Sequence, residues 1–150
     1  AAEDRRPFCL AIGFNAPHAE DADPMQYFPP PGTEHLYEGF EVPPAPKSEP
    51  RFYDHLPAYL RDGTLNRDRW QWRFNFESKR QSMTRGYFRM ISGVDRAVAR
   101  IRRRLEALGQ AQNTVIVFTS DNGYFLGERG YAGKWLPHEP SIRVPLLIFD

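Results

Sequence analysis

Three short apolar runs stand out along the chain. They occupy residues 8–14, 114–119 and 144–149, and each is continuous in hydrophobicity rather than alternating. Continuous runs of this length are typical of strands that are buried on both faces, as in parallel sheets. One turn of a buried helix is the alternative for the first run, but Gly13 and the flanking prolines disfavour it. The pattern therefore predicts three strands.

A helical period is clear between the first two runs. From Tyr87 to Leu108, apolar residues recur every three or four positions, while Arg89, Arg96 and other charged residues fall outside that stripe. Gly109 is a natural end for the helix. A coiled coil is the alternative, but the short span and the strand that follows favour a helix covering a sheet. Strand, helix and strand in this order predict an α/β fold with a largely parallel sheet flanked by helices.

A proline-rich segment lies between the first strand and the helix, at about residues 15–66. It holds nine of the 14 prolines, between Pro17 and Pro50, and proline lacks the amide donor that helices and sheets need. Aromatic and leucine residues are interspersed, and a solvated linker would not need them. They include Tyr27, Phe28, Leu36, Tyr37, Phe40, Phe52 and Tyr53. We therefore expect a long loop packed over the sheet, and loops of this length inside a domain are often functional.

Composition narrows the function classes. The net charge is +1, which disfavours a nucleic-acid binder. Residues 67–76 interleave arginines with aromatic rings that could stack on bases, but packing under the loop or contact with a sugar is the favoured interpretation. The longest apolar runs are far shorter than 18 residues, so we expect no membrane span. Cys9 is the only cysteine, which excludes an internal disulfide framework and a cysteine-rich zinc site.

Candidate chemistry lies where the predicted strands end, because ligands of α/β sheets bind beyond the carboxyl ends of strands. Asp121 and Asn122 offer two hard oxygens, which suit calcium or magnesium. His18 can exchange a proton near neutral pH, and Lys134 can hold an anion. Each has a simpler interpretation: Asn-Gly after a β-branched strand is typical of a hairpin with residues 124–126 returning, and His18 and Lys134 could be surface residues.

Several motifs together resemble the sulfatases of the alkaline phosphatase superfamily. They are the first strand with Ala16-Pro17-His18, the helix region at 87–105, the segment Thr119-Ser120-Asp121-Asn122-Gly123, and residues 126–146 with Leu-Gly-Glu and Gly-Lys-Trp. Motifs in the right order are more specific than any one of them. A weaker likeness points to N-acetylglucosamine-6-sulfatases. We expect an alkaline phosphatase-like domain.

The resemblance implies roles for individual residues. Sulfatases bind a divalent cation, usually Ca²⁺ with Mg²⁺ as the alternative, and Asp121 and Asn122 match two of its ligands. Lys134 matches a lysine that holds the sulfate, and His18 matches a histidine that contacts the sulfate and protonates the leaving alcohol. Arg129 stands where many relatives have histidine, at a position that faces the substrate. The partner implied is a sulfated small molecule or carbohydrate in a secreted, periplasmic or lysosomal-type compartment.

Two parts of the family pattern are absent from the sequence. The nucleophile of the family is a formylglycine made within a Cys/Ser-x-Pro-x-Arg motif, and Cys9 is followed by Leu10-Ala11-Ile12 instead. The N-terminal pair of aspartate ligands is absent too. We therefore expect residues 1–150 to be an incomplete, central-to-C-terminal fragment of one catalytic domain, inactive alone, with the formylglycine upstream. A phosphodiester or phosphonate ester hydrolase of the same superfamily and a non-catalytic binding or structural domain remain alternatives.

Overall fold

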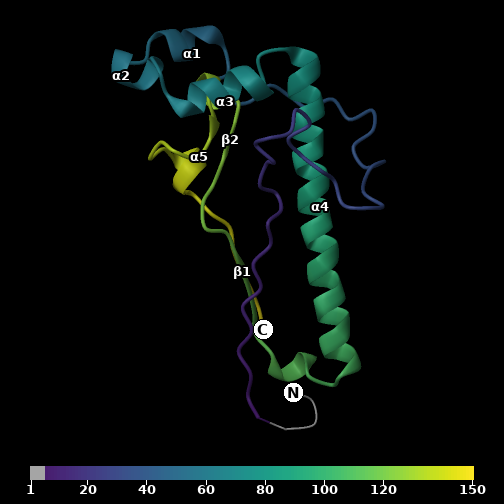
Figure 1. The fold of residues 1–150 in the computed structure, drawn as a ribbon. Coiled ribbons are helices and arrows are strands. Elements are labelled where there is room, and N and C mark those ends of the chain that lie inside the picture. The colour runs from purple at the N-terminus through teal and green to yellow at the C-terminus, as the bar shows by residue number, and fades with distance from the viewer. Residues whose placement is uncertain (1–5) are drawn as a thin grey trace. The chain divides into compact units, whose positions relative to one another are not determined.

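The computed structural model describes residues 6–150, so residues 1–5 of the predicted domain lie outside it (Figure 1). Helices and strands are both present, as the prediction of a mixed fold requires. In chain order the elements are α1 (Pro50–Asp54), α2 (Ala58–Arg61), α3 (Leu65–Arg73), α4 (Glu77–Ala107), the 3-10 helix η1 (Ala111–Asn113), β1 (Ile116–Thr119), β2 (Phe125–Leu126), the 3-10 helix η2 (Glu128–Gly130), β3 (Ala132–Gly133), α5 (Glu139–Ile142) and β4 (Leu146–Phe149).

The chain forms two compact units. Unit 1 consists of the described part of residues 1–37 together with residues 86–116 and 149–150, and unit 2 consists of residues 38–85 and 117–148. Helix α4 contributes its first part to unit 2 and the remainder to unit 1. Each unit is described below through its own contacts.

Helix α4 confirms the helical prediction and begins ten positions before Tyr87, at Glu77. It ends where the sequence predicts. Gly109 adopts a left-handed φ of 65°, and its N–H donates to the carbonyl of Glu106 at 2.9 Å. The N–H of Gln110 donates to the carbonyl of Leu105, which completes a Schellman-type end.

In unit 2, the proline-rich segment is held along α4 through its backbone carbonyls. Arg80 donates to the carbonyls of Val42 and Pro43, both at 2.9 Å, and Arg85 donates to that of Phe40 at 2.8 Å. Gln81 donates to the Val42 carbonyl and accepts from the Val42 N–H. A segment without ladder partners thus satisfies its polar backbone with side chains of the helix.

In unit 1, side chains of α4 also donate to backbone carbonyls of the proline-rich segment. Arg89 donates to the carbonyl of Leu36 at 2.8 Å, and Arg96 donates to that of Gly32 at 2.7 Å. The ring of Tyr27 packs edge-on against Tyr87, and a Cβ at Gly93 would lie 2.3 Å from Pro30. In both units, parts of the predicted loop within residues 27–43 pack along α4, and packing of the loop over a sheet remains a prediction. Arginines outside the apolar stripe make part of that contact.

The predicted loop also ends earlier than expected. Residues 15–49 contain no helix or strand, but α1, α2 and the start of α3 lie within residues 50–66. Pro50 sits in the first turn of α1, where the absent N–H costs nothing. Thr64 caps α3 by accepting the Arg67 N–H, and the turn before it contains Gly63 in a left-handed conformation.

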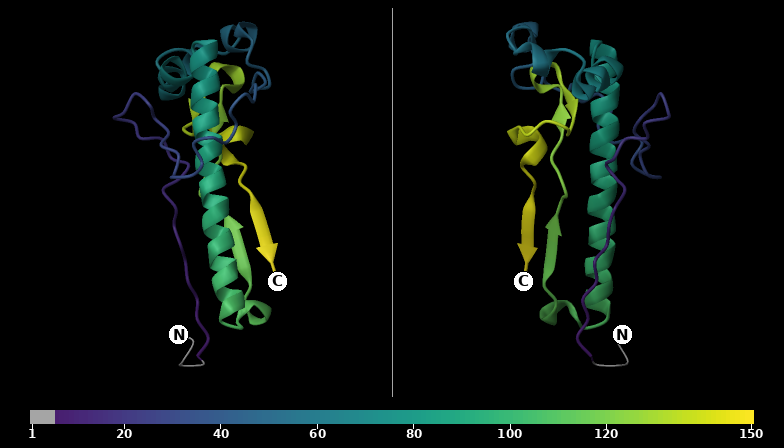
Figure 2. Two further views of the ribbon diagram at one scale, coloured as in Figure 1. Left: turned by 90° about the vertical axis from the view of Figure 1, so that its right-hand side faces the viewer. Right: turned by 60° about the vertical axis from the view of Figure 1, so that its left-hand side comes forward.

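The second and third predicted strands form, but the sheet differs from the prediction. β1 pairs with β4, and β2 pairs with β3 in antiparallel register, Phe125 opposite Gly133 and Leu126 opposite Ala132. Figure 2 shows β1 and β4 pointing in opposite directions. The chain leaves β1 and re-enters β4 from the same end through short elements. Within residues 6–150 there is therefore no crossover of the kind that makes neighbouring strands parallel.

The first predicted strand is absent. Residues 8–14 adopt no regular secondary structure, and their side chains are exposed, Leu10 to 69%. An apolar run becomes a strand only when another strand supplies its backbone partners, and none in the described part of the chain does so. Of the three predicted strands, two therefore form within residues 6–150.

Each unit has its own small core. In unit 2 the most buried apolar side chains are Phe125, Tyr131 and Ala132, which come from β2, β3 and the link between them. In unit 1 Tyr27 and Met90 are buried, from the loop and from α4. No helix within residues 6–150 is both long enough and apolar enough to cross a membrane.

Candidate active site

Asp121 and Asn122 form a tight turn directly after β1. The Asn122 N–H donates to Asp121 Oδ1 at 3.0 Å, and Asn122 Nδ2 donates to the carbonyl of Gly123 at 2.7 Å. Ser120 Oγ donates to the Asn122 carbonyl at 2.8 Å. Asp121 is exposed and Asn122 is half-buried. This arrangement leaves Asp121 Oδ2 and the amide oxygen of Asn122 without a bond to the turn itself.

Gly123 anchors this turn to α5. Its N–H donates to the carbonyl of Ser141 at 2.7 Å. A Cβ at this position would lie 2.2 Å from the carbonyl oxygen of Pro140 and 2.6 Å from that of Arg143. The backbone of α5 therefore crosses Gly123 so closely that only glycine fits. The hairpin interpretation is wrong, since residues 125–126 form a strand that pairs with β3 and not with β1.

Residues 127–130, here called the glycine turn, connect β2 to β3. Gly127, Arg129 and Gly130 all have left-handed φ values, of 116°, 56° and 71°. The turn closes through Gly130 N–H to the Gly127 carbonyl at 3.1 Å, and Glu128 Oε2 accepts the N–H of Leu126 at 2.7 Å. The regular spacing of Gly127, Gly130 and Gly133 in the sequence predicts a tight loop rather than a paired strand. Residues 127–130 form such a loop, but Gly133 lies in β3 and pairs with β2.

Arg129 is the unusual member of the glycine turn. A left-handed φ costs energy in any residue with a Cβ, and the other two left-handed positions of the turn avoid that cost by being glycine. The Arg129 N–H donates to the Lys47 carbonyl at 2.9 Å, which ties the turn to the segment before α1. Outliers of this kind cluster at functional sites.

Lys134 follows β3 at a second sharp bend. Gly133 has a φ of 95°, and a Cβ there would lie 2.1 Å from the ring of Trp135. The indole therefore folds back over Gly133, and half-buried Lys134 projects from the backbone between them. The guanidinium of Arg69 lies 5.9 Å from the centroid of the Trp135 ring.

His18 belongs to unit 1 and is exposed. Its Nδ1 lies 2.7 Å from the carbonyl oxygen of Ala19, and its N–H donates to the Asn15 carbonyl at 2.9 Å. The preceding Ala16–Pro17 peptide bond is cis. A carbonyl at Nδ1 selects the tautomer that carries hydrogen there, so Nε2 is the nitrogen open to another partner.

The structure thus places four of the five predicted residues in one unit. Asp121, Asn122, Arg129 and Lys134 all lie in unit 2, on the connections that follow β1, β2 and β3. That these four and His18 share one pocket remains a prediction.

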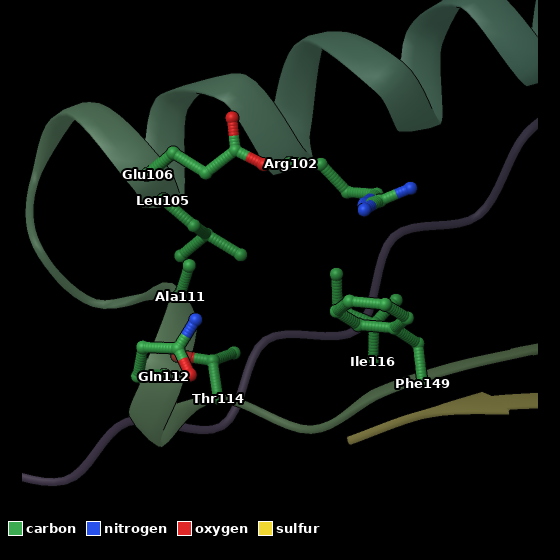
Figure 3. Close-up of a pocket in the computed structure, with 8 residues that line it drawn as sticks. All are labelled: Arg102, Leu105, Glu106, Ala111, Gln112, Thr114, Ile116 and Phe149. Carbon is green, nitrogen blue, oxygen red and sulfur yellow. The ribbon is translucent and has the colours of Figure 1, made fainter.

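A pocket at the end of α4 in unit 1 is not this site. Figure 3 shows it between α4, η1 and the strand residues Ile116 and Phe149. Arg102 lies over the Phe149 ring, 4.4 Å from its centroid. None of the five predicted site residues is among the residues that line it.

Three further residues hold the site and were missed by the sequence analysis. Arg67 donates to the carbonyl of Gly130 at 3.0 Å, Asn66 donates to that of Ala132 at 3.1 Å, and Arg73 donates to the hydroxyl of Tyr124 at 2.7 Å. All three lie on α3. The helical period gave no signal for them, because Arg67 and Arg73 are six positions apart and lie about 120° from each other around a helix of 3.6 residues per turn.

The donor set of the turn after β1 fits a calcium or magnesium ion in part. One carboxylate and one amide supply hard oxygens, as these cations prefer. Calcium takes six to eight oxygens. Within residues 6–150 there is no cluster of three or more histidine, cysteine, aspartate or glutamate side chains that could hold a metal. Asp121 and Asn122 therefore fit as contributors to a larger ligand set.

Comparison with known proteins identifies the family. The family model described as Sulfatase matches residues 1–150, and the chain belongs to this family. It is 33% identical over 153 residues to the extracellular sulfatase SULF-1 homolog of Drosophila melanogaster, covering 96% of this chain and 12% of that protein. It is 41% identical over 70 residues to an N-acetylglucosamine-6-O-sulfatase of Bacteroides thetaiotaomicron, covering 47% of this chain and 12% of that protein.

A solved structure, that of BT4656 in complex with its substrate D-glucosamine-2-N,6-O-disulfate, is 30% identical to this chain with a TM-score of 0.46. The match covers 64% of this chain and 22% of that one. The chain thus spans only a small part of the length of the relatives that it matches.

Proposed function

We propose that this chain is part of an enzyme that hydrolyses sulfate esters. The observation that carries the proposal is the turn after β1, where Gly123 is locked under α5 and Asp121 and Asn122 are left with open oxygens. Family membership supports it, because the matched relatives are sulfatases. The same unit contributes Arg129 and Lys134, two cations suited to a sulfate group.

Asp121 and Asn122 would hold Ca²⁺, or Mg²⁺ in its place, through one carboxylate and one amide oxygen. The Asn122 amide is oriented for this, because its nitrogen is engaged by the Gly123 carbonyl and its oxygen is the remaining acceptor. When bound, the cation would polarise the sulfate and neutralise charge that develops on its oxygens.

Lys134 and Arg129 would bind sulfate oxygens, and each would stabilise the charge that builds there as the ester bond breaks. His18 would donate a proton from Nε2 to the leaving alcohol oxygen. The carbonyl of Ala19 at Nδ1 would keep the ring oriented for that transfer. Removing one such contact in an enzyme costs on the order of 10²–10³ in rate.

The nucleophile of this proposal is a formylglycine on a part of the protein outside this sequence. The substrate is a sulfated carbohydrate or a sulfated small molecule. One relative supports the carbohydrate, since it is an N-acetylglucosamine-6-O-sulfatase.

We further propose that residues 1–150 belong to one catalytic domain with a larger, mostly parallel sheet. All four residues of β4 are exposed, and so are residues 8–14, although both segments are apolar. Apolar strands of this kind are stable when further strands and helices cover them. The short share of the relatives' length that the chain spans supports the same proposal.

The test uses the complete protein. Hydrolysis of sulfate monoesters and of phosphate diesters is measured before and after removal of divalent cations, with Asp121→Asn as the variant and Asp95→Asn, an exposed carboxylate on α4, as the matched control. We expect calcium-dependent hydrolysis of sulfate esters that Asp121→Asn lowers on the order of 10²-fold. Preference for phosphate diesters would assign the phosphoesterase alternative, and no turnover of either ester would assign a non-catalytic domain.

A further inference from the structure

Arg67 occupies an unusual environment on α3. Its guanidinium lies between two aromatic rings, 3.8 Å from the centroid of Tyr53 and 4.0 Å from that of Trp70. In the same position Nη1 donates to the Gly130 carbonyl at 3.0 Å. A planar guanidinium can stack on both its faces and donate at its edge at once, whereas a lysine ammonium cannot.

The hydrogen bond from Arg67 to Gly130 holds the glycine turn against α3. A Cβ at Gly130 would lie 2.6 Å from Arg67 Nη1 and 3.3 Å from Tyr53 Cβ, so the turn rests directly on this stack. Tyr131, the next residue, is fully buried, packs edge-on against Tyr53 and donates its hydroxyl to the Leu60 carbonyl at 2.7 Å. Burial raises the pKa of Tyr131, so it remains a neutral donor.

Asn66 extends the contact toward Lys134. Its side chain is 1% exposed, and Nδ2 donates to the carbonyl of Ala132 at 3.1 Å. Two consecutive residues of α3 therefore hold two carbonyls of one segment, at Gly130 and Ala132. Arg129 precedes the first of these carbonyls directly, and Lys134 follows the second by two residues.

The backbone at Arg129 indicates that its side chain is needed there. Arg129 adopts a left-handed φ that glycine would adopt without cost, between Gly127 and Gly130, which do so. A strained arginine is retained only where its surroundings fix the backbone, and the Arg67 stack and the Lys47 carbonyl fix it from both sides.

We propose that Arg67, together with Asn66, is a positioning residue that sets Arg129 and Lys134 for the anionic group of the substrate. The inference rests on the proposed function, because it takes these two cations as the ligands of a sulfate. Arg67 acts through the backbone of residues 130–132 and contacts no substrate itself.

A double-mutant cycle in the complete protein tests the coupling. The variants are Arg67→Lys, Arg129→Ala and their combination, and each is measured for binding of inorganic sulfate by calorimetry and for KM and kcat on a sulfate ester. Arg51→Lys is the matched control, because Arg51 also lies over an aromatic ring, that of Phe52 at 4.8 Å, but is largely exposed.

We expect Arg67→Lys to weaken sulfate binding and raise KM by about 5–10-fold, the scale of a lost charge-assisted hydrogen bond with its stacking, while kcat changes less. In the Arg129→Ala background the same change is expected to cost less than about 3-fold, because part of its effect passes through Arg129. Arg51→Lys is expected to leave both measurements within about 2-fold.

Equal losses in both backgrounds would show that Arg67 supports only the fold and would overturn the proposal. So would a wild-type protein that binds no sulfate. A wild type that binds sulfate but hydrolyses no ester would instead refute the proposed function, and the cycle on binding would still decide the role of Arg67. Should Arg67→Lys fail to fold, Trp70→Phe keeps the arginine and weakens its stack, and the same coupling to Arg129 is expected at about 2–3-fold.

Discussion

Replacing Gly123 by alanine tests whether the turn after β1 owes its shape to the backbone of α5. The new Cβ would lie 2.2 Å from the carbonyl oxygen of Pro140 and 2.6 Å from that of Arg143, against an ordinary contact of 3.4 Å or more. Both obstacles are backbone atoms, so no side-chain rotation relieves them. The turn must move by about 1.2 Å to restore the nearer contact.

The size of the effect follows from that movement. Overpacking against atoms that cannot turn aside costs about 1–3 kcal/mol. A shift of this size also stretches the 2.7 Å bond from the Gly123 N–H to the Ser141 carbonyl beyond hydrogen-bonding range, and losing that bond costs about 0.5–1.5 kcal/mol. We expect Gly123→Ala to lower the free energy of unfolding by about 2–4 kcal/mol.

Denaturant unfolding of the complete protein measures this free energy, and elemental analysis of the dialysed protein measures bound calcium. Calcium is expected to fall with stability, because Asp121 and Asn122 move with the turn. Asp95→Asn, a change at an exposed carboxylate on α4, is the control, and it is expected to change stability by less than about 0.5 kcal/mol. Equal unfolding free energies for the two variants would refute the steric argument.

Three other predictions concern single side chains. His18→Ala is expected to slow hydrolysis of alkyl sulfates more than that of nitrophenyl sulfate, whose leaving group needs less protonation, and equal losses in kcat/KM would contradict the acid role. Arg80 lowers the pKa of Glu77 from 4.5 to about 2, so its stabilisation is complete above pH 4.5 and is lost as the pH falls toward 2. Glu77→Gln should therefore flatten the decline in melting temperature between those pH values, and an unchanged profile would argue against the pair. Arg73→Met is expected to cost about 1.5–3 kcal/mol by chemical denaturation, because it removes a charged donor to Tyr124, and a much smaller loss would mean that the bond is weak.

The sequence was most informative where contacts are local. The stripe from Tyr87 to Leu108 and the glycine after it predicted α4 and its end, because helical bonds connect residues four apart. The β-branched run before Asp121 predicted β1 to within two residues. The regular glycines after residue 126 predicted a tight turn, since left-handed backbone favours glycine wherever it occurs.

The hydrophobic pattern of the sequence could not predict which distant segments pair with one another. Residues 8–14 have the composition of a strand, but composition does not supply a partner, and the run is unpaired. Asn122-Gly123 has the local signature of a hairpin, but the chain there is set by Ser141, which follows it by 18 positions. Whether such a dipeptide reverses the chain depends on what packs against it.

The candidate site was predicted by residue type, and its supporting contacts were not. Asp121, Asn122 and Lys134 could be selected because their side chains carry chemistry. Asn66 and Arg67 donate hydrogen bonds to backbone carbonyls. Every residue has a carbonyl, so the sequence of the contacted segment does not predict these contacts. For the interleaved arginines and aromatic rings of residues 67–76 the sequence left internal packing and ligand contact open, and at Arg67 the stacking is internal.

The arginines of α4 hold the proline-rich segment through hydrogen bonds to its backbone carbonyl oxygens. Arg80, Arg85, Arg89 and Arg96 each bind main-chain oxygens, and these do not depend on which amino acid bears them. Many side chains of the segment can therefore be substituted during evolution without loss of these hydrogen bonds, provided that the backbone keeps its course. A stretch of this kind can diverge quickly between species and still follow the same course.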